Sequence, residues 1–145
     1  MAEHAAGSTE VHGTPKEIMA VIADFEAYPE WVGQLEEARV LVKDRRGRGT
    51  QVAFKVDTPL FPAAYTLAYT YESRDAGISW TYVEGTLEDL SGSYRLEPLA
   101  DGGTRVTYDL SVGLNAPLPG LVKRRAAKQI VRSALADLKR RVESG

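Results

Sequence analysis

Apolar and polar residues alternate along the central part of the chain, from about Gln34 to Val112, as they do in half-buried β-strands. Turns rich in glycine interrupt this alternation. Asp101-Gly-Gly103 is the strongest hairpin turn, because glycine accepts positive φ angles freely. Strands that follow one another through short turns predict an antiparallel meander. The expected strands cover residues 8–12, 40–42, 52–56, 65–71, 78–82, 90–96 and 104–112.

Helical spacing replaces the alternation near both ends of the chain. Thr14 and Glu17 have the spacing of a capping box, and Pro15 occupies the first helical position, so we expect a helix to begin there. A break and a second short helix are expected within residues 24–31, where Pro29 stops the first helix from running on.

The longest expected element is a C-terminal helix that begins near Pro119 and reaches almost to Gly145. Its apolar residues fall on one arc of the helical wheel. Arg124 lies on the same arc, so its side chain either extends to solvent or points into the space beneath the helix. The apolar arc consists of Ala127, Ile130, Val131, Ala134, Leu135, Leu138 and Val142.

Composition indicates one ordinary globular domain, residues 1–145, because 43% of the residues are hydrophobic and 26% are charged. A formal net charge of -2 gives no reason to expect nucleic acid as a partner. The chain has no cysteine, which excludes disulfides, thiolate nucleophiles and cysteine metal sites.

The sequence also predicts no metal site and assigns no cofactor, since neither His4 nor His12 is accompanied by a second ligand. No run approaches the roughly 20 apolar residues that span a bilayer, so no stable membrane insertion is expected. The N-terminus lacks the apolar core of a signal peptide. We therefore expect a cytoplasmic protein that is a monomer or a homodimer.

The expected order of elements is one strand, two short helices, a run of antiparallel strands and a long C-terminal helix. With its local motifs, this order resembles the helix-grip fold of the START-like, or SRPBCC, superfamily, and is most similar to the polyketide cyclase/dehydrase and lipid-transport-like branch. The motifs are Asp24-Phe-Glu-Ala-Tyr-Pro-Glu-Trp31, Trp80, Gly92-Ser-Tyr94-Arg-Leu-Glu-Pro98, Gly103-Thr-Arg-Val-Thr-Tyr108, Pro117-Leu-Pro-Gly120 and Leu138-Lys-Arg-Arg-Val-Glu143.

This resemblance implies an α+β fold, in which a curved antiparallel sheet wraps around the C-terminal helix and a deep apolar cavity lies between them. Relatives use that cavity for lipids, quinones, sterols, plant hormones or polyketide intermediates. The resemblance implies no particular activity, because this fold hosts both enzymes and carriers.

Aromatic residues on the face of the sheet that we assign to the concave side form the candidate ligand site. They either fill the core or line a cavity. A buried phenol or indole without a hydrogen-bond partner costs roughly 1–3 kcal/mol, so several of them on one face favour a lined cavity. The expected ligand-binding set is Phe54, Tyr65, Tyr69, Trp80, Tyr94, Tyr108, Leu110, Arg124, Ala127 and Val131.

Three charged or exposed features each have more than one interpretation. Arg124 either binds an anionic ligand head or is a surface residue, solvated or paired with Glu84 or Asp57. The basic flank of the last helix either makes transient contact with anionic lipid or keeps an exposed helix soluble. Leu60 and Phe61 either cap the cavity, touch a membrane or pack on a neighbouring loop.

Two functions from different classes follow. The first is a protein that binds or carries a small hydrophobic or amphipathic ligand such as a lipid, quinone or polyketide-like molecule. The alternative is a polyketide cyclase, aromatase or dehydratase acting on a ligand in the same cavity. No strong base is expected within the cavity, so no catalytic residue is assigned.

Overall fold

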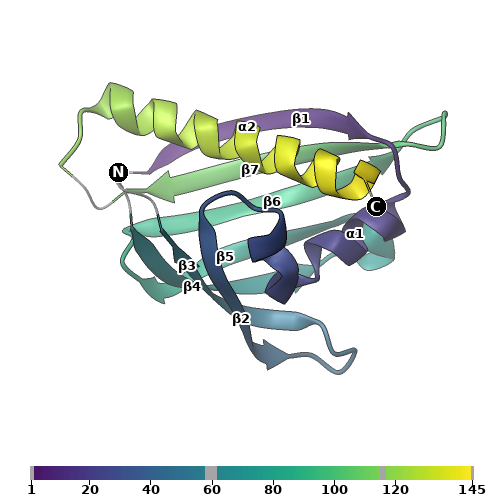
Figure 1. The fold of residues 1–145 in the computed structure, drawn as a ribbon, viewed down its shortest axis with the longest axis horizontal. Helices are drawn as coiled ribbons and strands as arrows, with labels where there is room; N and C mark the ends of the chain where they lie inside the picture. The colour runs from purple at the N-terminus through teal and green to yellow at the C-terminus, as the bar shows by residue number, and fades with distance from the viewer. Residues whose placement is uncertain (1, 58–61, 115–116, 145) are drawn as a thin grey trace.

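A curved seven-stranded antiparallel sheet forms the body of the protein (Figure 1). The computed structural model describes residues 2–57, 62–114 and 117–144. The strand order is β1-β7-β6-β5-β4-β3-β2, so the first strand pairs with the last, and β1 and β2 are the two edge strands. The strands are β1 (Glu3–Val11), β2 (Leu35–Lys43), β3 (Gly49–Val56), β4 (Ala63–Tyr71), β5 (Gly77–Gly85), β6 (Asp89–Pro98) and β7 (Thr104–Gly113).

Two short helical segments follow β1, as the sequence predicts. They are α1 (Pro15–Ile22) and the 3₁₀ helix η1 (Phe25–Glu30), and a second 3₁₀ turn, η2 (Ser73–Asp75), precedes β5. The capping box is confirmed, because the Thr14 hydroxyl accepts the Glu17 N–H at 3.2 Å and the Glu17 carboxylate accepts the Thr14 N–H at 3.1 Å. These bonds satisfy amides that a helix start would otherwise leave unpaired.

The long helix α2 (Gly120–Ser144) lies across the β1–β7 side of the concave face, and α1 and η1 cover the other side (Figure 1). A close approach of α2 to the sheet is allowed by Gly7, where a Cβ atom would lie 3.1 Å from Val131 Cγ1. The buried stripe of α2 consists of Ala127, Val131, Leu135 and Leu138.

The strands β2 and β3 begin earlier than expected, at Leu35 and Gly49, and two further differences follow from the packing of α2. The first strand begins at Glu3 rather than Ser8, because Ala5 and Gly7 occupy inward positions where only small side chains fit beneath α2, and this hides the alternation of the strand. Ile130, expected on the buried arc, is 39% exposed, because α2 packs mainly on β1 and β7 and buries a narrower stripe.

Leu60 and Phe61 lie outside the described residues. Among the residues that are described, no helix combines the length and apolar character needed to cross a bilayer.

Candidate ligand-binding site

Aromatic rings from four neighbouring strands meet on the concave face of the sheet. Trp80 of β5 occupies the centre, with ring centroids 5.9 Å from Tyr69, 5.6 Å from Tyr94 and 5.5 Å from Tyr108. Cross-strand pairing explains this, since Tyr69 lies opposite Trp80 and Tyr94 lies opposite Tyr108. Such pairs share a face of the sheet and pack side by side.

The cluster continues to the β3–β4 side of the sheet. Phe54 lies 5.6 Å from Tyr65 and 6.4 Å from Tyr69, again centroid to centroid. The structure therefore brings together the six aromatic residues that the sequence assigned to the site.

Two further rings come from η1 and were missed at the sequence level. The Phe25 ring is 4.5 Å from Tyr69, and the Tyr28 ring is 6.0 Å from Phe54. Phe25 and Tyr28 are three residues apart, the spacing that places two side chains on one face of a 3₁₀ helix, and this was the available signal.

The Trp80 indole packs directly against the backbone of Gly92 on the neighbouring strand β6. A Cβ atom at Gly92 would lie 2.7 Å from Trp80 Cζ2 and 2.4 Å from the carbonyl oxygen of Asp109. Any larger residue would push the indole away from β6, so the position of the central ring depends on this glycine.

The phenols of the concave side fall into two groups by their hydrogen bonds. Tyr28 donates to the carbonyl of Ile22 at 2.5 Å, and Tyr71 donates to the carbonyl of Gly49 at 2.6 Å. Tyr82 similarly donates to a backbone carbonyl, that of Leu87, at 2.9 Å. These three hydroxyls are therefore structural.

The second group has no hydrogen-bond partner among the described residues. It comprises the hydroxyls of Tyr65, Tyr69, Tyr94 and Tyr108 and the indole N–H of Trp80.

These unpaired atoms are nevertheless reached by water. Within the described part of the chain, no side-chain nitrogen or oxygen is both shielded from solvent and without a partner. Trp80, Tyr94 and Tyr108 are only 6%, 9% and 7% exposed, so their small remaining exposure includes the polar atoms. The ring cluster thus presents polar groups to water from a face that is otherwise covered.

Burial makes these phenols harder to ionise. It raises the pKa of Tyr65 to about 12 and the pKa values of Tyr69, Tyr94 and Tyr108 well above 10. A neutral phenol donates a hydrogen bond to a carbonyl or hydroxyl oxygen and also accepts one. The cluster is therefore suited to holding an uncharged polar group of an aromatic or aliphatic molecule.

The remaining predicted site residues lie elsewhere. Leu110, Ala127 and Val131 are buried between the sheet and α2, where they pack the two layers together. Arg124 is exposed on the first turns of α2 and forms no ion pair within the described part of the chain, so the expected pairs with Glu84 or Asp57 are not present there.

An open cleft of about 500 Å³ lies beside the ring cluster, between the η1–β2 connection and the end of α2. Trp31 lines this cleft, and its ring lies 5.0 Å from the Tyr28 ring, which connects the cleft to the cluster. The residues that line it are Pro29, Glu30, Trp31, Val32, Gly33, Gln34, Leu35, Arg140, Arg141 and Ser144.

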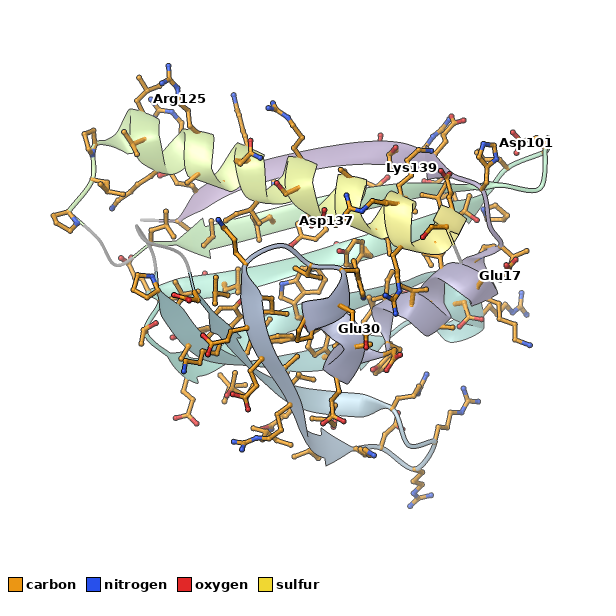
Figure 2. The ribbon with its side chains drawn as sticks, in the orientation of Figure 1. Glu17, Glu30, Asp101, Arg125, Asp137 and Lys139 are labelled. Carbon is orange, nitrogen blue, oxygen red and sulfur yellow. The ribbon has the colours of Figure 1, made fainter. Side chains whose placement is uncertain are left out.

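Polar contacts tie this connection to α2. Asp137 accepts the Gly33 N–H at 3.2 Å, and Arg141 pairs with Glu30 at 3.0 Å. Figure 2 shows Asp137 on α2 and Glu30 on the facing η1 segment. The η1–β2 connection beside the aromatic cluster is therefore held to α2 by exposed polar contacts, which are weaker than buried apolar packing and break more readily.

Neither histidine belongs to the site. His4 pairs with Asp109 at 2.6 Å, and His12 donates its backbone N–H to Glu143. Among the described residues, no group of three His, Cys, Asp or Glu side chains is placed to hold a metal ion.

The sheet, the closing helix and the aromatic face between them define a helix-grip protein. The family model described as polyketide cyclase / dehydrase and lipid transport matches residues 11–139, and the chain belongs to that family. No curated protein sequence matches the chain.

Solved structures show the same fold. A START superfamily protein from Mycobacterium smegmatis superposes with a TM-score of 0.87 at 23% identity, covering 97% of each chain. The Zhui aromatase/cyclase from a Streptomyces species has a TM-score of 0.75 at 16% identity, covering 99% of this chain and 94% of its own. A STAR-related lipid transfer protein fragment from Xanthomonas axonopodis has a TM-score of 0.76 at 15% identity, with coverage of 97% and 85%.

Proposed function

We propose that this protein, as one domain over residues 1–145, binds and carries a small hydrophobic or amphipathic molecule between its sheet and α2. One observation carries the proposal: several neutral phenols and one indole N–H on a mostly buried aromatic face have no protein hydrogen-bond partner among the described residues and keep some contact with solvent. A ligand there would bury apolar area at about 25 cal/mol per Å² and supply the missing hydrogen-bond partners.

The proposed ligand class is a lipid, a quinone or a polyketide-like molecule that carries a carbonyl or hydroxyl oxygen. Neutral phenols suit such oxygens, and the family and the solved relatives include lipid-transfer and aromatase/cyclase proteins. The proposed contact set is that of the sequence analysis: Phe54, Tyr65, Tyr69, Trp80, Tyr94, Tyr108, Leu110, Ala127 and Val131, with Arg124 at the entrance for an anionic head group.

Fluorescence of Trp80 tests the proposal directly. Trp31 and Trp80 are the only tryptophans, so a Trp31→Phe variant leaves the central ring as the single reporter. We expect menadione and a long-chain fatty alcohol to quench or shift its emission saturably. Native mass spectrometry of protein purified from its own host should show a co-purified small molecule. A flat titration with every probe, together with consistently empty protein, would contradict the proposal.

Arg124→Ala tests the proposed anionic contact separately. We expect weaker binding of a fatty acid and unchanged binding of the matching fatty alcohol, because only the acid offers a carboxylate to the guanidinium. An equal affinity of Arg124→Ala and wild type for the acid would remove Arg124 from the site.

A cyclase or dehydratase acting on a polyketide-like substrate is the second candidate, and the aromatase/cyclase relative favours it. The described ring cluster contains no carboxylate or imidazole, so catalysis there would rest on holding a flexible chain in a reactive conformation and polarising a carbonyl. Conversion of a synthetic polyketone thioester to a cyclic product, lost on Tyr94→Phe, would support this activity.

The proposal includes a cytoplasmic location, a monomeric or homodimeric state and transient membrane contact.

The start of α2 has the residues that membrane contact needs. Leu121 and Val122 are 52% and 40% exposed beside the cations Arg124 and Arg125, at the end of α2 where Figure 2 labels Arg125. Apolar and basic residues together favour anionic bilayers. Flotation with phosphatidylglycerol vesicles should decrease for Leu121→Asp; an unchanged result would argue against membrane contact.

A further inference from the structure

The two edges of the sheet are built differently. At one edge, β2 has three register shifts against β3, and such irregularities discourage another strand from pairing. At the other edge, β1 pairs with β7 through nine consecutive residues without any shift. A regular edge strand is a template for an added strand unless something covers it.

The helix α2 covers only the C-terminal part of this edge. Lys139 donates to the carbonyl of Glu10 at 2.5 Å, and Glu143 accepts the backbone N–H of His12 at 2.9 Å. These contacts show that the backbone groups of Glu10 and His12 point away from β7. Figure 2 shows Lys139 on the part of α2 that runs beside β1.

In an extended strand, the backbone N–H and C=O groups of every second residue point in the same direction. His4, Ala6 and Ser8 therefore also direct their N–H and C=O groups away from β7. Within the described residues none of these backbone groups has a hydrogen-bond partner. The N-terminal part of the β1 edge is thus open.

An open groove of about 500 Å³ lies along this uncovered stretch, between β1 and α2. Val131 and Leu135 give it an apolar side, while Lys128 and Arg132 stand on successive turns of α2. Neither cation forms an ion pair with a described residue, and none of the described residues that line the groove is acidic.

We propose that this groove is a docking site for an extended acidic peptide segment of a partner protein, which adds to the sheet beside β1. His4 to Ser8 spans five residues, or about 17 Å at 3.4 Å per residue, so a segment of similar length fits. Its backbone would pair with His4, Ala6 and Ser8, and its carboxylates would meet Lys128 and Arg132. Of the residues proposed to contact the ligand, the groove shares only Val131, and its test uses Ala6, Lys128 and Arg132, so the proposal does not depend on the ligand.

A fluorescein-labelled, acetylated heptapeptide of alternating glutamate and threonine is the probe, with the same peptide carrying lysine for glutamate as its control. We expect the acidic peptide to bind, its affinity to fall as salt rises from 50 to 300 mM, and the lysine peptide not to bind. The double variant Lys128→Glu/Arg132→Glu should lose at least tenfold in affinity.

Strand addition is separated from simple charge attraction by Ala6→Pro. Proline removes the outward N–H of residue 6 while leaving the ladder to β7 intact, so folding should be retained and peptide affinity should fall at least tenfold. Lys128→Met is the matched control for charge alone, because it changes no backbone donor. Amide hydrogen exchange of the wild-type protein gives a second measurement, in which Ala6 and Ser8 gain protection when the peptide is added.

Several outcomes would overturn the proposal. These are equal binding of the acidic and lysine peptides, unchanged exchange at Ala6 and Ser8, or an affinity that Ala6→Pro leaves unaltered. Self-association that Ala6→Pro abolishes would assign the edge to a second copy of this chain instead. Phosphatidylglycerol vesicle binding that is lost on Lys128→Glu/Arg132→Glu, with no peptide binding, would assign it to a membrane. If Ala6→Pro fails to fold, the exchange experiment decides alone.

Discussion

The same substitution, tyrosine to phenylalanine, should have opposite consequences at two sets of positions on the concave face. Tyr71→Phe removes a 2.6 Å hydrogen bond to the carbonyl of buried Gly49. The lost bond and the unsatisfied carbonyl together should lower the free energy of unfolding by about 1–3 kcal/mol. At Tyr94 and Tyr108 the hydroxyl has no hydrogen-bond partner among the described residues, so removing it should change the free energy of unfolding by less than about 0.5 kcal/mol.

Urea denaturation of the three single variants, followed by circular dichroism, measures these differences. Ligand titration of the same proteins should reverse the order. Tyr94→Phe and Tyr108→Phe should weaken binding of a carbonyl-containing ligand by roughly 2–12-fold, the equivalent of one hydrogen bond, while Tyr71→Phe should leave it almost unchanged. If Tyr94→Phe and Tyr108→Phe destabilise the protein as much as Tyr71→Phe, their hydroxyls have partners, and the inferred contact with open space is wrong.

Three further predictions concern stability. Gly92→Ala should cost about 1–3 kcal/mol and displace Trp80, because the new Cβ would lie 2.4 Å from a backbone oxygen; an unchanged urea midpoint and unchanged Trp80 emission would argue against the close packing. The pKa of Tyr65 is raised from 10 to about 12, so its contribution, at most ~2.7 kcal/mol, is complete below pH 10 and lost between pH 10 and 12. The part of the tyrosinate absorbance at 295 nm that Tyr65→Phe removes should therefore rise together with unfolding, and an earlier rise of that part would contradict this. Thr14→Ala should cost about 1 kcal/mol, and a double-mutant cycle with Glu17→Ala should show coupling; additive losses would refute the capping box.

The parts of this fold that follow from local chemistry were predictable. The alternation of Tyr65, Leu67 and Tyr69 with small or polar residues places one strand and its inward face, and the Thr14 cap places the start of α1. The six predicted aromatic residues do meet, because strand alternation and hairpin order together decide which side chains share a face.

The parts that depend on tertiary pairing were not predictable. The early start of β1 depends on its partner β7, and its inward Ala5 and Gly7 give no apolar signal of their own. The exposure of Ile130 depends on how α2 is rotated against the strands β1 and β7, on which it mainly packs. The bond between Asp137 and Gly33 joins residues 104 positions apart, and neither residue carries a sequence signal for it.

The pairing of β1 with β7 also sets the order in which a nascent chain can assemble. His4 and Asp109 are 105 positions apart, so at 5–20 residues per second a growing chain waits roughly 5–20 s before its first strand meets its partner. During that interval the hairpins from β2 to β6 can form in succession, while α2 does not yet cover the aromatic face. The still unpaired strand β1 contains Ala5, Ala6, Gly7 and Ser8, whose small side chains give it little tendency to aggregate. The small residues that let α2 pack closely against β1 in the folded protein should thus also limit aggregation of the nascent chain through this unpaired strand.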